Sequence, residues 1–241
     1  MYCLFDACVV AAYYLPKSTR SKQLVKNARN LIESVRSGES QHFFYIPNFC
    51  IAEVFSVFMK YAYGQWNSQV KHGTIHGKIH NSLRDQFQKD IHNAKLFYHY
   101  ELSRYHVLSI NLVAPIDHYF KLSRGKGRNK SGVNPAGTFD HLIIAMGLHL
   151  AKIHGPENVC IITADDRLEK IVNKCNSGIP SDTKRKLNLS QSHKLTGIDF
   201  NKDSFPYVVN LKKPKKKIMK SLFEDWPLPV KNRYKKPYLA K

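Results

Sequence analysis

The sequence predicts an α/β fold with a central, mainly parallel sheet. Short apolar runs that are typical of buried strands alternate along the chain with longer segments of helical periodicity. Such alternation favours a parallel sheet whose crossover connections are helices. A length of 241 residues and a hydrophobic content of 43% suffice for one domain with a sizeable core. We therefore expect one domain over residues 1–211 and a basic tail over residues 212–241.

The first part of the chain contains two predicted strands, each leading into a helix. Tyr2–Phe5 is a short apolar run that ends at Asp6, and the helix or helical turn after it is stopped by Pro16. A periodic helix closed by Gly38 follows. Phe43–Ile46 then predicts the second buried strand.

A helix is expected to start at Pro47-Asn48, with Asn48 as its N-cap, and to run through Glu53 towards Gly64. The region from about 65 to 105 is polar and rich in histidine, and we interpret it as a helical insertion. The six histidines from His72 to His106 are expected to face solvent or substrate rather than zinc, since no H-E-x-x-H motif is present.

The third strand is expected at Val107–Ile110, with a helix at Ala114–Leu122. Thr138 is the expected N-cap of the helix that begins near Asp140. The apolar run Val159–Thr163 predicts a further strand.

The chain after that strand is expected to form a helix over Asp166–Lys174 and a last strand over Phe205–Leu211. Residues 176–204 fit two interpretations, completion of the core or a separate basic flap.

The charge of the chain indicates an acidic partner. There are 38 Lys and Arg against 18 Asp and Glu, a net charge of +20. Nucleic acid is the commonest such partner, and an anionic membrane surface is the alternative. The five cysteines are odd in number and form no C-x-x-C pair, which is typical of buried thiols in a reducing compartment. The absence of a basic leader and of an apolar run near 20 residues predicts a soluble, cytoplasmic protein without a membrane span.

Four carboxylates lie where strands should end or helices begin: Asp6, Glu53, Asp140 and Asp165. Ligands of parallel sheets bind beyond the carboxyl ends of the strands, so these acids could converge. Hard divalent ions such as Mg²⁺ and Mn²⁺ prefer oxygen ligands. Taken singly, each acid also fits an ordinary turn or helix cap. All four in this order favour a divalent-metal site.

The order of these motifs resembles the PIN-domain family, metal-dependent nucleases that include the VapC toxins of toxin–antitoxin pairs. The motifs are an aspartate after the first strand (LFDACVVAAYYLP), a glutamate in a helix after IP (YIPNFCIAEVFSVF), an aspartate opening a hydrophobic helix (FDHLIIAMGL) and T-x-D after a late strand (IITADDRLEKI). They span about residues 1–175. The insertion and the basic extension depart from the small toxins of the family.

The resemblance implies a three-layer α/β/α sandwich and a Mg²⁺- or Mn²⁺-dependent endoribonuclease. RNA would be cut by metal-activated water, leaving a 5′-phosphate and a 3′-hydroxyl. A toxin would have a cognate antitoxin protein, and homodimers are common in the family. Carried onto this chain, the catalytic and metal-binding acids are Asp6, Glu53, Asp140 and Asp165, with Asp166 as an auxiliary metal ligand and Thr163 as a polar support.

Basic segments are expected to contact the RNA backbone. They are the loop residues Arg124, Lys126, Arg128 and Lys130 and the tail residues Lys212, Lys213, Lys215, Lys216 and Lys217. The tail from residue 212 holds 11 Lys and Arg against two acids. For the loop, the alternative is a solvated surface loop. For the tail, the alternatives are a disordered solubilising segment and docking on the domain's own surface.

Two other functions fit the same sequence. One is a non-catalytic PIN-like module that holds RNA or a protein partner without cutting. The other is an interaction protein whose basic tail binds an anionic membrane surface.

Overall fold

The computed structural model describes residues 1–16, 21–40, 42–64, 73–122, 136–177, 179–188, 191–197, 204–214 and 222. Within them, five strands form one all-parallel sheet in the order β3-β2-β1-β4-β5. The predicted α/β fold with a central parallel sheet is therefore confirmed. The strands are β1 (Tyr2–Phe5), β2 (Phe43–Pro47), β3 (Phe97–Tyr100), β4 (Val159–Thr163) and β5 (Tyr207–Asn210).

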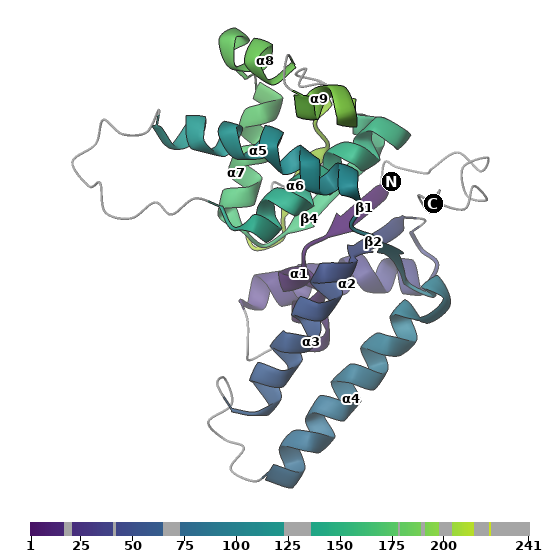
Figure 1. Ribbon diagram of the computed structural model, residues 1–241. Helices are drawn as coiled ribbons and strands as arrows, with labels where there is room; N and C mark the ends of the chain where they lie inside the picture. The colour runs from purple at the N-terminus through teal and green to yellow at the C-terminus, as the bar shows by residue number, and fades with distance from the viewer. Residues whose placement is uncertain are drawn as a thin grey trace.

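The sheet lies between two groups of helices (Figure 1). The first group, which connects β1 to β2 and β2 to β3, contains α1 (Ala7–Tyr14), α2 (Lys22–Arg36), α3 (Asn48–Ala62) and α4 (Gly73–Ile91). The second group contains α5 (Arg104–Leu122), α6 (Thr138–His154), α7 (Asp166–Ser177), α8 (Ser181–Asn188) and α9 (Gln191–Thr196). Short 3₁₀ turns, η2 (His92–Ala94) and η3 (Pro156–Asn158), precede β3 and β4.

The order of the strands creates a switch point between β1 and β4. The chain first adds β2 and β3 on one side of β1 and then places β4 and β5 on the other side. Phe5 is in register with Ile162, and the backbone N–H of Asp6 donates to the carbonyl of Ile162 over 2.9 Å. Ligands of open α/β sheets bind at such a point, beyond the carboxyl ends of the strands.

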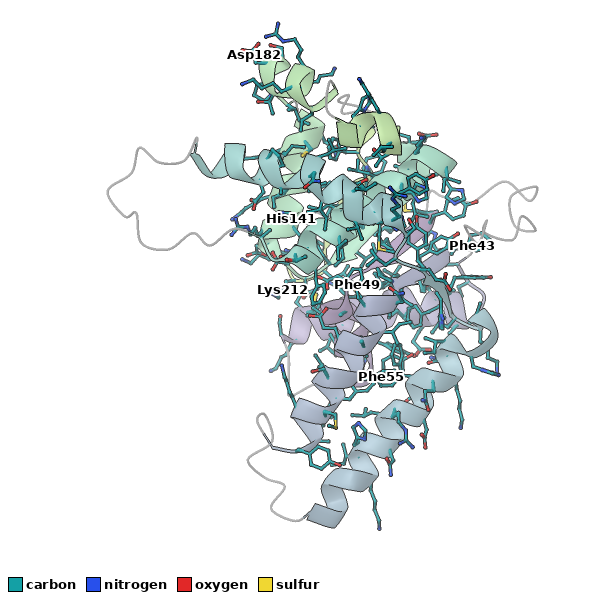
Figure 2. The ribbon with its side chains drawn as sticks, in the orientation of Figure 1. Phe43, Phe49, Phe55, His141, Asp182 and Lys212 are labelled. Carbon is teal, nitrogen blue, oxygen red and sulfur yellow. The ribbon has the colours of Figure 1, made fainter. Side chains whose placement is uncertain are left out.

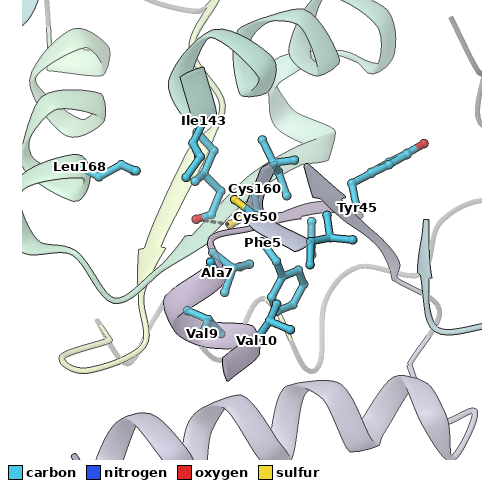
Figure 3. Packing of buried hydrophobic residues seen from close by; sticks show 14 of the residues in the cluster. Phe5, Ala7, Val9, Val10, Tyr45, Cys50, Ile143, Cys160 and Leu168 are labelled. Carbon is cyan, nitrogen blue, oxygen red and sulfur yellow. Dashed lines mark hydrogen bonds between the residues drawn. The ribbon is translucent and has the colours of Figure 1, made fainter. Parts of the chain in front are cut away.

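The two central strands are continuous apolar runs because both of their faces are covered. All residues of β1 and all residues of β4 are buried. Side chains of β1, β2, β4, α1, α3, α6 and α7 meet in one hydrophobic cluster around the ends of these strands (Figure 3). A Cβ on Gly147 would lie 2.6 Å from Cδ1 of Ile161, so glycine lets α6 approach β4 closely.

The expected position of the third strand was wrong. Val107–Ile110 belongs to α5, and the third strand is Phe97–Tyr100, at the edge of the sheet beside β2. The segment interpreted as a helical insertion thus supplies α4 and β3. Buried positions in α5 recur every three or four residues, as a helix requires: His106, Ser109, Leu112, Val113 and Ile116.

Both expected N-caps were also wrong by one residue. Pro47 and Gly137 occupy the N-cap positions of α3 and α6, and neither cap makes a side-chain hydrogen bond to its helix. Asn48 and Thr138 are instead the first helical residues. The predicted bounds of β1 and β4 are confirmed.

The remaining expectations concern the cysteines, residues 176–204 and membrane spans. All five cysteines are free, and four of them are buried. Leu187 of α8 is part of the hydrophobic core, and α9 packs on α5. Across the described ranges, no helix is long and apolar enough to cross a membrane.

Candidate functional site

Asp6 lies at the switch point, at the end of β1. Its carboxylate caps α1 by accepting the backbone N–H of Cys8 over 3.3 Å. The Cys8 thiol and the Thr163 hydroxyl both donate to Oδ2 of Asp6, over 2.9 Å and 2.6 Å. Three donors therefore hold a carboxylate that is only 8% exposed. None of these donors carries a charge that would neutralise it.

Thr163 and Asp165 form the opposite side of the switch point, at the end of β4. The Thr163 hydroxyl accepts the backbone N–H of Asp165 over 2.9 Å while it donates to Asp6. Oδ1 of Asp165 accepts the backbone N–H groups of Arg167 and Leu168, the latter over 3.0 Å. Asp165 is thus the cap of α7, fixed relative to Asp6 through one threonine.

Glu53 of α3 and Asp140 of α6 face the same region from the two groups of helices. Burial raises the pKa of Glu53, and the charges of Asp6 and Asp140 raise it further. Burial also raises the pKa of Asp140, together with the charges of Asp165 and Asp6, although the backbone N–H of Gly137 opposes the shift. Asp140 is therefore close enough to Glu53, Asp6 and Asp165 for their charges to repel, and so is Glu53 to Asp6.

This cluster of Asp6, Glu53, Asp140 and Asp165, the acid cluster, lacks an ion-pair partner among the described residues. None of its members forms an ion pair with a Lys or Arg of that part of the chain. Lys60 and His141 only moderate the raised pKa values of Glu53 and Asp140. Repulsion without a paired cation is the charge pattern that a bound divalent ion would relieve.

The donors of the acid cluster fit a hard divalent ion in type and charge, since all are carboxylate oxygens. Their positions do not form a ready coordination shell. Within the described ranges, no group of three or more His, Cys, Asp or Glu side chains is arranged to hold a metal ion. Binding would require the carboxylates to close in on the ion.

No family model, curated protein or solved structure matches this chain.

Asp166, expected as an auxiliary metal ligand, is engaged elsewhere. Its Oδ1 accepts the Asn210 amide over 2.7 Å, and its Oδ2 lies 3.6 Å from Nζ of Lys213. The hydrogen bond from Asn210, with smaller contributions from Lys213 and Lys212, lowers the pKa of Asp166. This carboxylate thus already has the ion-pair partner that the acid cluster lacks among the described residues.

The expected RNA-binding residues are described only in part. Lys212 and Lys213 are exposed directly after β5, and the charge of Lys212 reaches Cys8 beside Asp6. Figure 2 shows Lys212 at the level of the sheet, between the two groups of helices. The other expected residues lie outside the described ranges: Arg124, Lys126, Arg128, Lys130, Lys215, Lys216 and Lys217.

A buried ion pair next to the acid cluster was missed in the sequence. Asp117 of α5 is 4% exposed and accepts the backbone N–H of Ala136 over 2.9 Å. Its two oxygens lie 3.1 and 3.3 Å from Nη2 of Arg167, and Nε2 of His141 lies 3.5 Å away. Burial would raise the pKa of Asp117, but these partners outweigh it and lower the pKa.

Asp117 therefore joins the starts of α6 and α7, where Asp140 and Asp165 lie. A lone aspartate inside a helical segment gives no sequence signal for such a role. His141 directly follows Asp140, and Arg167 lies two residues after Asp165; these spacings were the available hint.

The cysteines at the site are poor nucleophiles. Burial raises the pKa of Cys8 and of Cys50 well above the ordinary value, and the charge of Asp6 adds to both shifts. A cysteine needs a lowered pKa to attack as a thiolate. The site therefore does not favour covalent catalysis by cysteine.

His106 contradicts the expectation that the histidines face solvent, because it is only 1% exposed. Its Nδ1 accepts the backbone N–H of Ser103 over 2.9 Å, so the neutral ring carries its proton on Nε2. That nitrogen lies 3.0 Å from Nδ1 of His149 and 3.2 Å from the hydroxyl of Tyr100. Burial first, and then the charge of His149, lowers the pKa of His106 to about 3.

Proposed function

We propose that this protein is a Mg²⁺- or Mn²⁺-dependent endoribonuclease of PIN type. One observation carries the proposal: the four acids of the acid cluster, far apart in sequence, lie around the switch point, and none of them forms an ion pair with a Lys or Arg of the described residues. The parallel sheet between two groups of helices agrees with the architecture that the resemblance implies. The toxin role, with an antitoxin partner and a homodimer, rests on the resemblance alone.

Asp6, Glu53, Asp140 and Asp165 would hold one or two ions. A bound ion would supply positive charge to the phosphate and lower the pKa of water. The chain's own residues prepare this arrangement. Thr163 orients the Oδ2 atom of Asp6 and the backbone of Asp165, since its hydroxyl bonds both.

RNA fits the charge of the chain. A net charge of +20 attracts polyanions strongly, and contacts of Lys or Arg with phosphates give affinity without base readout. Lys212 and Lys213 lie exposed on the side of the site where β5 ends. These residues would contact the phosphates of the RNA backbone on either side of the cleaved bond.

The second candidate is a non-catalytic module that holds RNA or a protein. One observation favours it: the carboxylates do not stand in a ready metal-binding arrangement within the described ranges. Such a module would bind without forming products.

The test is cleavage of end-labelled RNAs in Mn²⁺ or Mg²⁺, with an EDTA arm. Asp6→Asn and Asp165→Asn should abolish cleavage and preserve the fold, because Asn still accepts the N–H groups that each aspartate caps. Asp182→Asn is the matched control, since this side chain is 83% exposed on α8 (Figure 2). Retained cleavage in both site variants contradicts the proposal. RNA that is bound but not cut by the wild type favours the non-catalytic module.

A further inference from the structure

Asp117 is connected to Asp140 through the backbone that enters α6. Oδ2 of Asp117 accepts the buried backbone N–H of Ala136 over 2.9 Å. The next residue, Gly137, is the N-cap of α6, and its N–H donates to Oδ2 of Asp140 over 2.9 Å. Nε2 of His141, which directly follows Asp140, lies 3.5 Å from Oδ2 of Asp117. Two successive backbone N–H groups thus bind the two carboxylates, so the contact with Asp117 fixes the peptide that holds Asp140.

Asp117 is also connected to Asp165, through Arg167. Nη2 of Arg167 lies 3.1 Å from Oδ1 of Asp117 and 3.3 Å from Oδ2. The backbone N–H of the same arginine donates to Oδ1 of Asp165. Arg167 belongs to the first turn of α7, which Asp165 caps. The side chain of Arg167 therefore ties the start of α7 to Asp117, while its backbone holds Asp165.

These contacts leave one oxygen of each acid for an ion. Oδ2 of Asp140 and Oδ1 of Asp165 are the atoms that accept backbone N–H groups. No donor of the described residues forms a hydrogen bond with the other oxygen of either carboxylate. The charge of Asp165 acts on Asp140, so the two carboxylates lie near each other. Their orientation depends on contacts that lead back to one side chain, which is only 4% exposed.

A second buried aspartate has an arginine partner but no connection to the acid cluster. Asp90, near the end of α4, is 5% exposed. It accepts hydrogen bonds from Nη2 of Arg36 and from the hydroxyl of Tyr14, each over 2.6 Å. The helices that carry this pair, α2 and α4, contain none of the four acids. Asp90 is therefore the comparison for a buried pair that stabilises the fold alone.

We propose that Asp117 is a positioning residue: it sets the separation and orientation of Asp140 and Asp165, and thereby the affinity of the acid cluster for a divalent ion. The part that concerns the ion rests on the proposed function. Groups that hold a metal ligand from behind fix its orientation, and their replacement typically weakens metal binding by about 10- to 100-fold. Asp117 acts in this way through Ala136 and Arg167 rather than by contact with the ion.

Mn²⁺ binding to the full-length chain, followed by electron paramagnetic resonance of the free ion, separates positioning from an effect of charge. Asp117→Asn removes a negative charge and Arg167→Met removes a positive one. Charge alone would weaken Mn²⁺ binding in the first variant and strengthen it in the second. Positioning predicts that both variants weaken binding, by about tenfold. Asp90→Asn breaks a buried pair of the same kind and should leave the affinity unchanged.

The amide protons of Gly137 and Arg167 provide a readout in EDTA that needs no ion. They form the hydrogen bonds to Asp140 and Asp165. In two-dimensional NMR spectra of the metal-free protein, Asp117→Asn should shift or broaden both signals, whereas Asp90→Asn should leave both in place.

Unchanged Mn²⁺ affinity of Asp117→Asn, or opposite changes in Asp117→Asn and Arg167→Met, overturns the proposal and leaves the metal site standing. Equal weakening by Asp90→Asn also overturns it, since lost stability would then explain the effect. If the wild type binds no Mn²⁺, the proposed function fails and the NMR signals decide on the positioning role. Two unmoved amide signals then overturn that role, and two displaced signals support it.

Discussion

The hydroxyl of Thr163 donates to the carboxylate of Asp6 over 2.6 Å. This bond joins the ends of the two central strands at the point where the topology of the sheet reverses. It connects residues that are 157 positions apart in sequence. The candidate site therefore depends on the pairing of β1 with β4 rather than on any local motif.

Replacing Thr163 by valine should damage both the fold and the activity. Thr163→Val removes a donor to Asp6 and an acceptor for the backbone N–H of Asp165. We expect a loss of about 1 to 3 kcal/mol in the free energy of unfolding, measured in urea. Cleavage should fall by about 10- to 100-fold because Asp6 loses its orientation. Thr163→Ser keeps the hydroxyl and should retain both; a loss in Thr163→Ser as large as that in Thr163→Val would contradict the role assigned to the hydroxyl.

Removing one charge from the acid cluster should stabilise the metal-free protein. The pKa of Glu53 is raised, so the fold favours its protonated form. That stabilisation is present below the ordinary pKa of 4.5 and is lost as the pH rises through the raised value. At pH 7, Glu53→Gln should therefore raise the free energy of unfolding, by at most about 0.5 kcal/mol because solvent screens this exposed helix position.

Glu53→Gln is measured by chemical unfolding in EDTA at low salt. Glu101→Gln is the control, since Glu101 is exposed. The gain should shrink at high salt, as repulsion between partly exposed charges is screened. A stability of Glu53→Gln below that of the wild type would mean that the acids do not repel one another.

Buried histidines should make the fold sensitive to mild acid. Burial lowers the pKa of His42 to about 4, and burial with the charge of His149 lowers that of His106 to about 3. As the pH falls below the ordinary value of 6.5, the unfolded chain binds protons that the folded chain excludes, so stability decreases. Between pH 7 and 5.5, these two residues together should reduce the free energy of unfolding by about 2 to 3 kcal/mol.

Urea unfolding at both pH values tests this expectation. His99→Gln, which replaces an exposed histidine, is the control and should leave the difference in unfolding free energy between the two pH values unchanged. The raised pKa values of Glu53 and Asp140 act in the opposite direction, at lower pH where carboxylates bind protons. A stability that is constant from pH 7 to 5.5 would contradict the neutral, buried state of the histidines.

Breaking the pair of Asp117 and Arg167 should cost stability by leaving a guanidinium without its carboxylate. We expect Asp117→Asn to lower the free energy of unfolding by about 3 kcal/mol, the lower end for a buried pair, since Arg167 is partly exposed. The double variant Asp117→Asn/Arg167→Met should recover part of this loss because it removes the unpaired charge. Strictly additive effects in urea unfolding would show that the two side chains do not interact.

The central strands could be predicted from the sequence and the edge strand could not. Buried parallel strands are continuous apolar runs, so YCLF and VCIIT were recognisable with their bounds. The third strand, FYHY, lies at the edge of the sheet, and only its first and last residues are buried, so it is not a continuous apolar run. The run VLSI was mistaken for a strand because it contains β-branched residues, which favour strands but also occur in helices. Here the packing of α5 on α6 favours the helix.

The acids of the candidate site could be predicted from the sequence. Which of these carboxylates are paired with basic or amide side chains could not. The strand-end positions of Asp6 and Asp165 followed from the apolar runs before them. The partners that separate Asp166 from the acid cluster, Asn210 and Lys213, lie more than 40 residues away.

Titration of the protein with Mn²⁺, with free ion followed by electron paramagnetic resonance, tests the central claim most directly. The claim is that the acid cluster binds a divalent ion. No Lys or Arg of the described residues forms an ion pair with these carboxylates. We predict that the wild type binds Mn²⁺ and that Asp140→Asn weakens binding at least tenfold, in line with the loss of one charged ligand. Asp166→Asn removes the same charge from a carboxylate already paired with Lys213 and should leave the affinity unchanged. No binding by the wild type, or equal affinity in all three proteins, would contradict the account.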